Sequence, residues 1–307
     1  MEQPNFAPLA PTRWQKIVTR LDAYERLIRL DKPIGTLLLL WPTLTALWLA
    51  SSGSPPWILI VIFVLGTVLM RSAGCAINDY ADRDFDAHVE RTANRPLARG
   101  EFEAWEALVV AAVLAFCAFL LVLSLNRTTI LLSIPALAIA IVYPFCKRFF
   151  ALPQAFLGIA FSFGIPMAFA AIYARVPAVG WWLFAANLFW VIAYDTEYAM
   201  VDRDDDLKLG LKTSAITFGR YDVLLVMLCY AIYVAALAYI GHVRQMGAMF
   251  YVGVLIATLL ACWHYWLIRN RDRRDCFRAF LGNHWVGLTI FAGVVADFGL
   301  RLNHWPR

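Results

Sequence analysis

Nine long apolar segments dominate the sequence, and each is long enough to cross a lipid bilayer as a helix. A transmembrane helix needs about 20 mostly apolar residues, within a range of about 17 to 25. The apolar residues are consecutive within each segment, whereas the strands of a membrane barrel alternate apolar with polar side chains. The sequence therefore predicts an all-α, multi-pass transmembrane helical bundle with nine spans. The expected spans cover residues 34–50, 57–77, 104–125, 129–145, 152–174, 178–201, 222–241, 246–268 and 284–300.

The composition agrees with a membrane protein. Of the 307 residues, 61% are apolar and 16% are charged, against about 45–50% and 25% in soluble domains. Such a chain is not intrinsically disordered, and its excess apolar surface must face lipid. Pro42, Pro135 and Pro166 lie inside expected spans. Since proline removes a backbone hydrogen bond from a helix, we expect each to kink its span.

Lysine and arginine are concentrated in alternate connections between the spans. Of the 27 such residues, 22 lie in the N-terminal segment and in residues 71–103, 146–151, 202–221 and 269–283. Because cytoplasmic connections carry most Lys and Arg, we expect a cytoplasmic N-terminus and an external C-terminus. The net charge of +5 then reflects orientation, and no nucleic-acid partner is needed. The expected division is a cytoplasmic N-terminal segment, residues 1–33, and a nine-span domain, residues 34–307.

Neither the cysteines nor the histidines indicate a metal site of the zinc type. The six cysteines form no C-x-x-C pair and the five histidines form no H-E-x-x-H pattern. We interpret the cysteines as small hydrophobic residues. The first 33 residues lack the short apolar region and small-residue cleavage site of a secretory signal, so we expect none there.

Two acidic clusters follow the second and sixth expected spans. The first reads NDYADRDFD at residues 78–86, and the second reads DRDDD at residues 202–206. If the helices continue through these clusters, residues four apart share a face. The residues that would share a face are Asn78, Asp82 and Asp86 in the first cluster, and Asp202 and Asp206 in the second.

Carboxylates four apart on a helix repel each other, so a cation between them is expected. Magnesium prefers oxygen ligands and commonly joins one or two carboxylates to substrate phosphates. Two facing carboxylate sets therefore predict a site that holds a diphosphate through Mg²⁺. The alternative is that these are solvated charges paired with nearby Arg83, Arg91, Arg203 and Lys208. The position of both clusters at membrane boundaries, where unpaired charge is costly, favours the functional interpretation.

Two longer stretches around these clusters resemble a known family. Residues 78–100, NDYADRDFDAHVERTANRPLARG, and residues 195–219, DTEYAMVDRDDDLKLGLKTSAITFG, are similar to the signature regions of the UbiA superfamily of intramembrane prenyltransferases. The forms N-x-x-x-D-x-x-x-D and D-x-x-x-D both fit. The likeness extends from RLDKP at residues 29–33 through the nine spans. The segments TANRPL and DTxYAMVDRxDD are most similar to those of bacterial members that prenylate 4-hydroxybenzoate, the precursor of the ubiquinone ring.

The resemblance implies an enzyme of ubiquinone biosynthesis in the bacterial inner membrane, with its site facing the cytoplasm. Its substrates would be a polyprenyl diphosphate and 4-hydroxybenzoate, prenylated ortho to the hydroxyl, with Mg²⁺ as cofactor. Membrane lipid would surround it, and no obligate protein partner is indicated. Another aromatic acceptor is one alternative, and a cation-coupled membrane transporter is another. The transporter is disfavoured because both clusters lie at one end of their spans instead of at the bilayer midplane.

The resemblance also implies roles for individual residues. In the family, one magnesium ion is bound by residues that match Asn78, Asp82 and Asp86, and the other by residues that match Asp202 and Asp206. The residues that match the diphosphate-binding pair are Tyr143 and Lys147, and Arg148 adjoins them. Arg29 and Lys32 match a basic group before the first span, and Arg71 matches an arginine in the pocket. The expected catalytic residues are the four aspartates of these sets and Lys147.

The implied chemistry accounts for these residue types. Lys147 and Arg148 would stabilise the charge that develops on the departing diphosphate. Asp202 could accept a hydrogen bond from the acceptor's hydroxyl, and Arg71 could bind the acceptor's carboxylate in a bidentate manner. The alternative for Arg71 is a helix-end arginine that extends to the membrane interface. Asp195 and Glu197, inside the sixth span, are candidates for function or for partners of a Tyr or Arg side chain.

Overall fold

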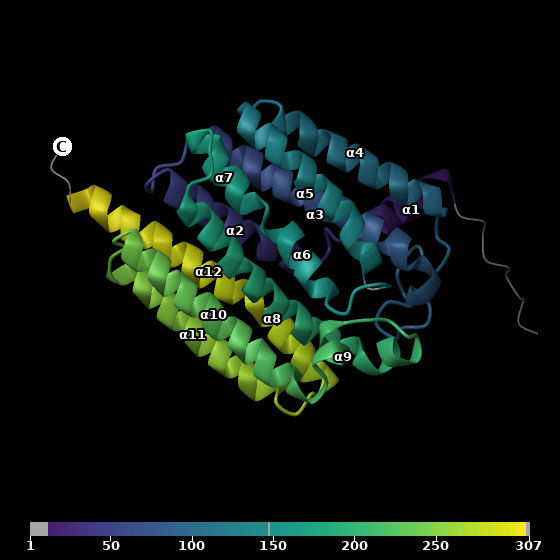
Figure 1. Ribbon diagram of the computed structural model, residues 1–307. Coiled ribbons are helices and arrows are strands. Elements are labelled where there is room, and N and C mark those ends of the chain that lie inside the picture. Colours follow the sequence, from purple (N-terminus) through teal and green to yellow (C-terminus); the bar gives the residue numbers. More distant parts are fainter. Residues whose placement is uncertain (1–11, 147, 305–307) are drawn as a thin grey trace, which may run out of the picture.

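The computed structural model describes residues 12–146 and 148–304, and within them it contains helices and no strands. Its long helices run side by side, with α4 and α11 on opposite sides of the bundle (Figure 1). The elements are α1 Arg13–Leu27, α2 Ile34–Ala50, α3 Trp57–Asp86, α4 Ala104–Val122, α5 Arg127–Cys146, α6 Pro153–Ser162, α7 Gly164–Tyr173, α8 Ala178–Lys208, α9 Ser214–Phe218, a 3-10 turn Gly219–Tyr221, α10 Asp222–Val243, α11 Ala248–Ile268 and α12 Arg273–His304.

All nine expected spans are helical, which confirms the predicted fold class. Eight helical segments among the described residues are long and apolar enough to cross a membrane. The remaining span, α2, has 17 residues, within the range that a bilayer accepts. The second and sixth spans are longer than predicted, because α3 continues to Asp86 and α8 continues to Lys208. Both acidic clusters are therefore helical, which is the condition under which their residues four apart share a face.

The fifth span is divided into two helices, α6 and α7, with Phe163 between them. Pro166 lies in the first turn of α7, where it cannot donate a backbone hydrogen bond to Ser162 four residues earlier. The Ser162 hydroxyl donates to the carbonyl of Gly158, and Asn187 of α8 donates to the hydroxyl. Pro42 and Pro135 lie inside α2 and α5, which are not interrupted.

A buried polar cluster joins α8 to α10, α11 and α12. The Glu197 carboxylate accepts hydrogen bonds from the Tyr230 hydroxyl at 3.0 Å and from the Asn283 amide at 2.8 Å. His264 Nδ1 lies 3.0 Å from the same hydroxyl, and the Trp190 indole donates to Asn283. All of these side chains are buried. Glu197 is thus a partner of Tyr230, and the cluster fixes α8 within the bundle.

Helix α1 lies inside the N-terminal segment, for which the sequence predicted no secondary structure. Thr12 and Gln15 form a capping box at its beginning, an arrangement that satisfies free N–H groups at a helix N-terminus. Ala23 and Leu27 are buried in a small cluster that includes Ala76 of α3 and Ala107 of α4. Helix α1 is therefore packed against the bundle.

Candidate active site

The two acidic clusters have the same pattern of burial. In each, the first and last aspartates of the D-x-D-x-D sequence are buried, with 3% to 8% of their surface exposed, and the central one faces outward. This pattern follows from the helical period, which places residues four apart on one face. The buried residues are Asp82, Asp86, Asp202 and Asp206, and the exposed residues are Asp84 and Asp204.

The predicted residues of α3 and α5 lie together. The Asn78 amide donates to the Asp82 carboxylate at 3.2 Å, and the Tyr143 hydroxyl donates to the amide oxygen of Asn78 at 3.5 Å. Arg148, just after α5, donates to the backbone carbonyl of Ala81. The structure therefore brings the amide, the phenol and a cation to one end of α3.

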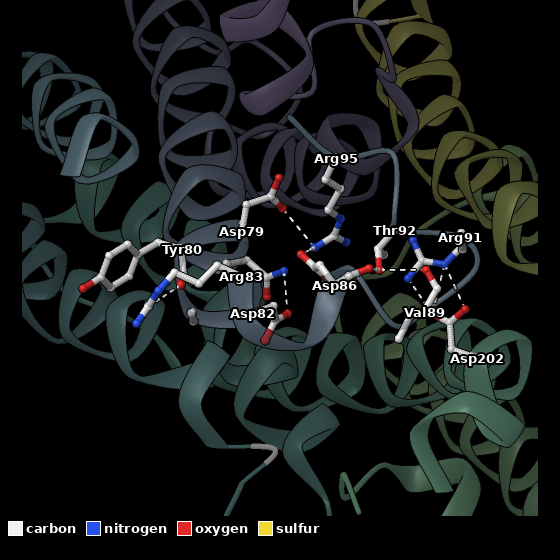
Figure 2. A network of polar contacts seen from close by, with 12 residues as sticks. Asp79, Tyr80, Asp82, Arg83, Asp86, Val89, Arg91, Thr92, Arg95 and Asp202 are labelled. Atoms are coloured by element: carbon white, nitrogen blue, oxygen red, sulfur yellow. Dashed lines mark hydrogen bonds and ion pairs between the residues drawn. The ribbon is translucent and has the colours of Figure 1, made fainter. Parts of the chain in front are cut away.

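Arg95 lies between two carboxylates of α3, as Figure 2 shows. Its Nη1 is 3.0 Å from Asp79 and 2.7 Å from Asp86. Arg29, which precedes α2, also contacts Asp79, at 3.1 Å. Burial lowers the pKa of Arg95, but the charges of Asp79 and Asp86 outweigh this effect, so the pKa is raised above its ordinary value. Arg95 therefore supplies positive charge to Asp79 and Asp86, which are seven residues apart on α3. The metal ion predicted beside Asp82 and Asp86 stays a prediction.

Arg91 lies in the segment between α3 and α4 and links this segment to α8. Its Nε is 3.0 Å from one Asp202 oxygen, and its guanidinium lies 4.4 Å from the centre of the Tyr198 ring. Tyr198 and Asp202 are four residues apart on α8 and so share a face. Together, Arg91 and Arg95 join residues 87–103 to both acidic helices (Figure 2).

Sequence reasoning did not identify Asp79 or Arg95, and it considered Arg91 only as a possible partner for the acidic clusters. The ion pair with an acidic-cluster residue that this alternative expected is present for Arg91 with buried Asp202, for Arg83 with Asp84 and for Lys208 with Asp205. It is absent for Arg203, which instead pairs with Asp222 at 3.1 Å. The available signal for Arg95 was its place in the TANRPL stretch.

The donor atoms fit magnesium bound together with a substrate. Within residues 12–146 and 148–304, no three His, Cys, Asp or Glu side chains form a group that could hold a metal ion by themselves. Magnesium does not need such a group, because it commonly takes one or two carboxylates and completes its shell with water and phosphate oxygens. The predicted ligands in both clusters supply only oxygen atoms of that kind, from carboxylates and an amide.

An apolar cavity of about 240 Å³ lies among α2, α3, α4, α5, α6 and α7. Its walls include Leu39, Phe63, Met70, Phe119, Leu137 and Met167. Arg71 and Tyr143 also line it, and the Tyr143 hydroxyl joins the cavity to Asn78. The Arg71 guanidinium lies 5.7 Å from the centre of the Phe161 ring, and its buried Nε has no hydrogen-bond partner among the described residues. Arg71 therefore lies in the cavity wall rather than at the interface.

Two predicted cations differ from the rest. Lys147 lies outside the described residues. The Lys32 side chain is 69% exposed and its ammonium lies 3.9 Å from Asp31. Of the two basic residues expected before the first span, Arg29 contacts the acidic network and Lys32 faces outward.

The fold and the site define a multi-pass membrane protein with an apolar cavity that is linked to the buried acidic set of α3 through Tyr143 and Asn78, and with a second buried acidic set on α8. Comparison with known protein families identifies the class of protein to which this combination belongs. The model of the UbiA prenyltransferase family matches residues 39–287, and the chain belongs to that family. It is therefore an enzyme of the prenyltransferase class, and the transporter alternative has no support.

Relatives and solved structures agree with this assignment. The chain is 60% identical to 4-hydroxybenzoate octaprenyltransferase of Dechloromonas aromatica (strain RCB) over 286 residues, 93% of this chain and 97% of the relative. Identity to the protein of the same name from Cupriavidus necator (strain ATCC 17699) is 60%, covering 93% of this chain and all of that one. The fold matches a UbiA homolog from Aeropyrum pernix K1 with TM-score 0.75 and 27% identity, covering 85% of this chain and 97% of that one. A UbiA homolog from Archaeoglobus fulgidus bound to GPP and Mg²⁺ gives TM-score 0.70 at 20% identity, covering 89% and 99%, and supports the fold.

Proposed function

We propose that this chain transfers a polyprenyl group from polyprenyl diphosphate to the ring carbon ortho to the hydroxyl of 4-hydroxybenzoate, as a magnesium-dependent step of ubiquinone biosynthesis. The observation that carries the proposal is the contact between the apolar cavity and the buried acidic set of α3, through Tyr143 and Asn78. A polyprenyl diphosphate has an apolar tail and a charged head, and the two parts of the site match them. The names of the relatives support 4-hydroxybenzoate as acceptor.

The diphosphate end of the site consists of the two buried acidic sets. Asn78, Asp82 and Asp86 would hold one magnesium ion, and Asp202 and Asp206 a second. A bound magnesium ion supplies positive charge to the leaving diphosphate. Arg148 lies at the same end of α3, where its guanidinium can stabilise the charge on the diphosphate oxygens. Lys147 is assigned the same role from the resemblance.

The reacting carbons meet in the apolar part of the site. The allylic C–O bond breaks with both electrons leaving on the diphosphate, the ring carbon bonds to the allylic carbon, and the proton that the ring carbon loses passes to an oxygen of the departing diphosphate. Walls of aliphatic and aromatic side chains exclude water, which would otherwise quench the allylic cation. Arg71, buried in this wall, can bind the acceptor's carboxylate through two parallel hydrogen bonds. Asp202 can accept a hydrogen bond from the acceptor's hydroxyl as the ring loses electrons.

The test is product formation by the full chain in a bilayer. Purified protein receives Mg²⁺, polyprenyl diphosphates of several lengths and a mixture of 4-hydroxybenzoate, homogentisate and dihydroxynaphthoate, and products are identified by mass spectrometry. We expect 3-polyprenyl-4-hydroxybenzoate. Prenylation of a different acceptor would keep the reaction class and change the substrate. No product from folded protein at any prenyl length would reject the proposal.

The shared burial pattern of the clusters supplies matched variants. Asp82→Asn and Asp202→Asn should abolish product formation, because each removes a buried carboxylate from a proposed ligand set. Asp84→Asn and Asp204→Asn change outward-facing members of the same clusters and should retain most of the activity. Gel-filtration elution in detergent checks that all four variants fold. Activity in Asp82→Asn equal to that in Asp84→Asn would contradict the ligand assignment.

A further inference from the structure

Helix α1 presents an apolar face that no described residue covers. Trp14, Ile17, Val18 and Leu21 follow the spacing i, i+3, i+4, i+7, which places them on one side of the helix. They are 71%, 42%, 47% and 62% exposed, respectively. Single exposed apolar side chains are ordinary, whereas a contiguous group indicates a contact surface. We call these four residues the exposed face of α1.

The neighbouring side of α1 is docked on the bundle. Leu27 is fully buried with Ala76 of α3 and Ala107 of α4. Arg20 and the Tyr24 hydroxyl both bond to the carboxylate of Glu106, near the beginning of α4. Helix α1 therefore cannot move freely, and it lies at the end of the bundle where α4 begins (Figure 1).

The charges around the exposed face are unevenly compensated. Arg20, Arg26 and Arg29 form ion pairs with Glu106, Glu101 and Asp79, respectively. Arg13 and Lys16, in the first two turns, form no ion pair within residues 12–146 and 148–304, and the first turn of α1 has no acidic residue. Among the described residues, the positive charge that forms no ion pair therefore lies on the same two turns as Trp14, Ile17 and Val18. A helix with tryptophan and aliphatic residues on one face and free cations beside them suits an anionic membrane surface.

The beginning of α4 indicates what covers the exposed face. Trp105, Leu108 and Val109 are 62%, 40% and 49% exposed on a helix long and apolar enough to span a membrane. Tryptophan is enriched at the level of the lipid headgroups. Since α1 docks on this part of α4, a bilayer around α4 reaches α1 as well.

We propose that α1 is an interfacial helix whose exposed face enters the headgroup region of the adjacent leaflet, with Arg13 and Lys16 binding anionic phospholipid headgroups. This property goes beyond prenyl transfer and does not depend on it. Residues 28–33 connect α1 directly to α2 and contain Arg29, which contacts Asp79. Lipid binding by α1 would therefore also hold one end of the acidic network in place.

Photo-crosslinking of the full chain tests this placement. Benzoylphenylalanine replaces Leu21 on the exposed face or, as the control, Asp22, whose side chain is 60% exposed on the adjoining polar face. The protein is reconstituted in nanodiscs of phosphatidylcholine alone or of phosphatidylcholine and phosphatidylglycerol in equal parts, and adducts are identified by mass spectrometry. We expect lipid adducts at position 21, few at position 22, and phosphatidylglycerol enriched among the adducts.

The charges are tested separately. Arg13→Gln and Lys16→Gln should each reduce the enrichment of phosphatidylglycerol at position 21 by about fivefold, the factor expected for one basic residue near an anionic surface. Equal lipid adducts at positions 21 and 22 would overturn the proposal. So would a crosslink from position 21 to a second copy of the chain, or adducts that match the bulk lipid composition in every variant. None of these measurements depends on prenyl transfer, so the lipid-binding proposal can fail or succeed independently of the proposed function.

Discussion

Arg71 owes its position to a glycine on the neighbouring helix. A Cβ atom on Gly35 of α2 would lie 2.5 Å from Arg71 Nη2 and 2.7 Å from Nε. These distances are below van der Waals contact, so any larger residue at position 35 must displace the guanidinium. The backbone at Gly35 need not move, because the clash would involve only the mobile end of the Arg71 side chain.

Gly35→Ala should therefore weaken acceptor binding and leave the fold intact. If Arg71 binds the acceptor's carboxylate, we expect KM for 4-hydroxybenzoate to rise about tenfold, equivalent to about 1.4 kcal/mol, with kcat little changed. Steady-state kinetics in detergent or nanodiscs measure both constants. Gly299→Ala, where a Cβ meets open space, serves as the control. An unchanged KM in Gly35→Ala would remove Arg71 from the acceptor site.

Arg91 competes for a carboxylate that the proposed site assigns to magnesium. Arg91→Gln should raise the affinity of the substrate-free protein for Mg²⁺ about tenfold, because a hydrogen-bonded ion pair with Asp202 of about 1.5 kcal/mol no longer has to be broken. Calorimetric titration with MgCl₂ measures the affinity. Arg83→Gln, which removes the partner of outward-facing Asp84, should leave it unchanged. A weaker affinity in Arg91→Gln would show that Arg91 supports the ligand set instead of occupying it.

Helices α11 and α12 approach each other closely through glycine. A Cβ on Gly253 of α11 would lie 2.5 Å from the backbone carbonyl oxygen of Thr289 and 3.2 Å from the Cα of Gly293 on α12. Membrane helices have no hydrophobic driving force between them, so packing at small residues supplies much of their association. This contact is rigid on both sides, in contrast to the one between Gly35 and Arg71.

Gly253→Ala should consequently destabilise the bundle. Separating the two helices to fit a methyl group is an overpacking change, with an expected cost of about 1–3 kcal/mol. A lower apparent Tm in detergent, followed by the loss of the gel-filtration peak on heating, measures the effect. Gly66→Ala places its Cβ in open space on α3 and should leave the Tm within error. An equal Tm for Gly253→Ala and the native chain would contradict the close packing.

At the scale of the whole molecule, the orientation in the membrane decides which compartment the acidic sets face. The connections at residues 87–103 and 209–213 lie at the ends of α3 and α8, beside the buried aspartates. The uneven distribution of Lys and Arg predicts that these connections are cytoplasmic. The connection between α10 and α11 would then be external.

Reporter insertions test this orientation. Alkaline phosphatase, which is active only outside the cytoplasm, should be active when inserted after Gln245 and inactive when inserted after Gly210. A fluorescent reporter that folds only in the cytoplasm should give the reverse pattern at the same two positions. Phosphatase activity after Gly210, with none after Gln245, would invert the orientation and place the site on the outside.

Local sequence properties determined the helices and the faces of the acidic clusters. Bilayer thickness sets the length of an apolar span, and the helical period sets which residues share a face. The positions of nine spans and the pairing of Asp82 with Asp86 and Asp202 with Asp206 on common faces follow from these two quantities. Hydropathy did not predict the break between α6 and α7 or the points at which α3 and α8 end, because it locates an apolar span but not the exact ends of a helix.

Contacts between distant segments were decided only by the tertiary structure. Arg91 and Asp202 are 111 residues apart in the sequence, and Arg29 and Asp79 are 50 apart. Which cation neutralises which carboxylate depends on how the helices pack and where the α3–α4 connection runs. The docking of α1 and the contact of Gly35 with Arg71 have the same origin, because each depends on which two helix surfaces meet. Hydropathy and helical period describe the surface of a single helix and do not predict its partner.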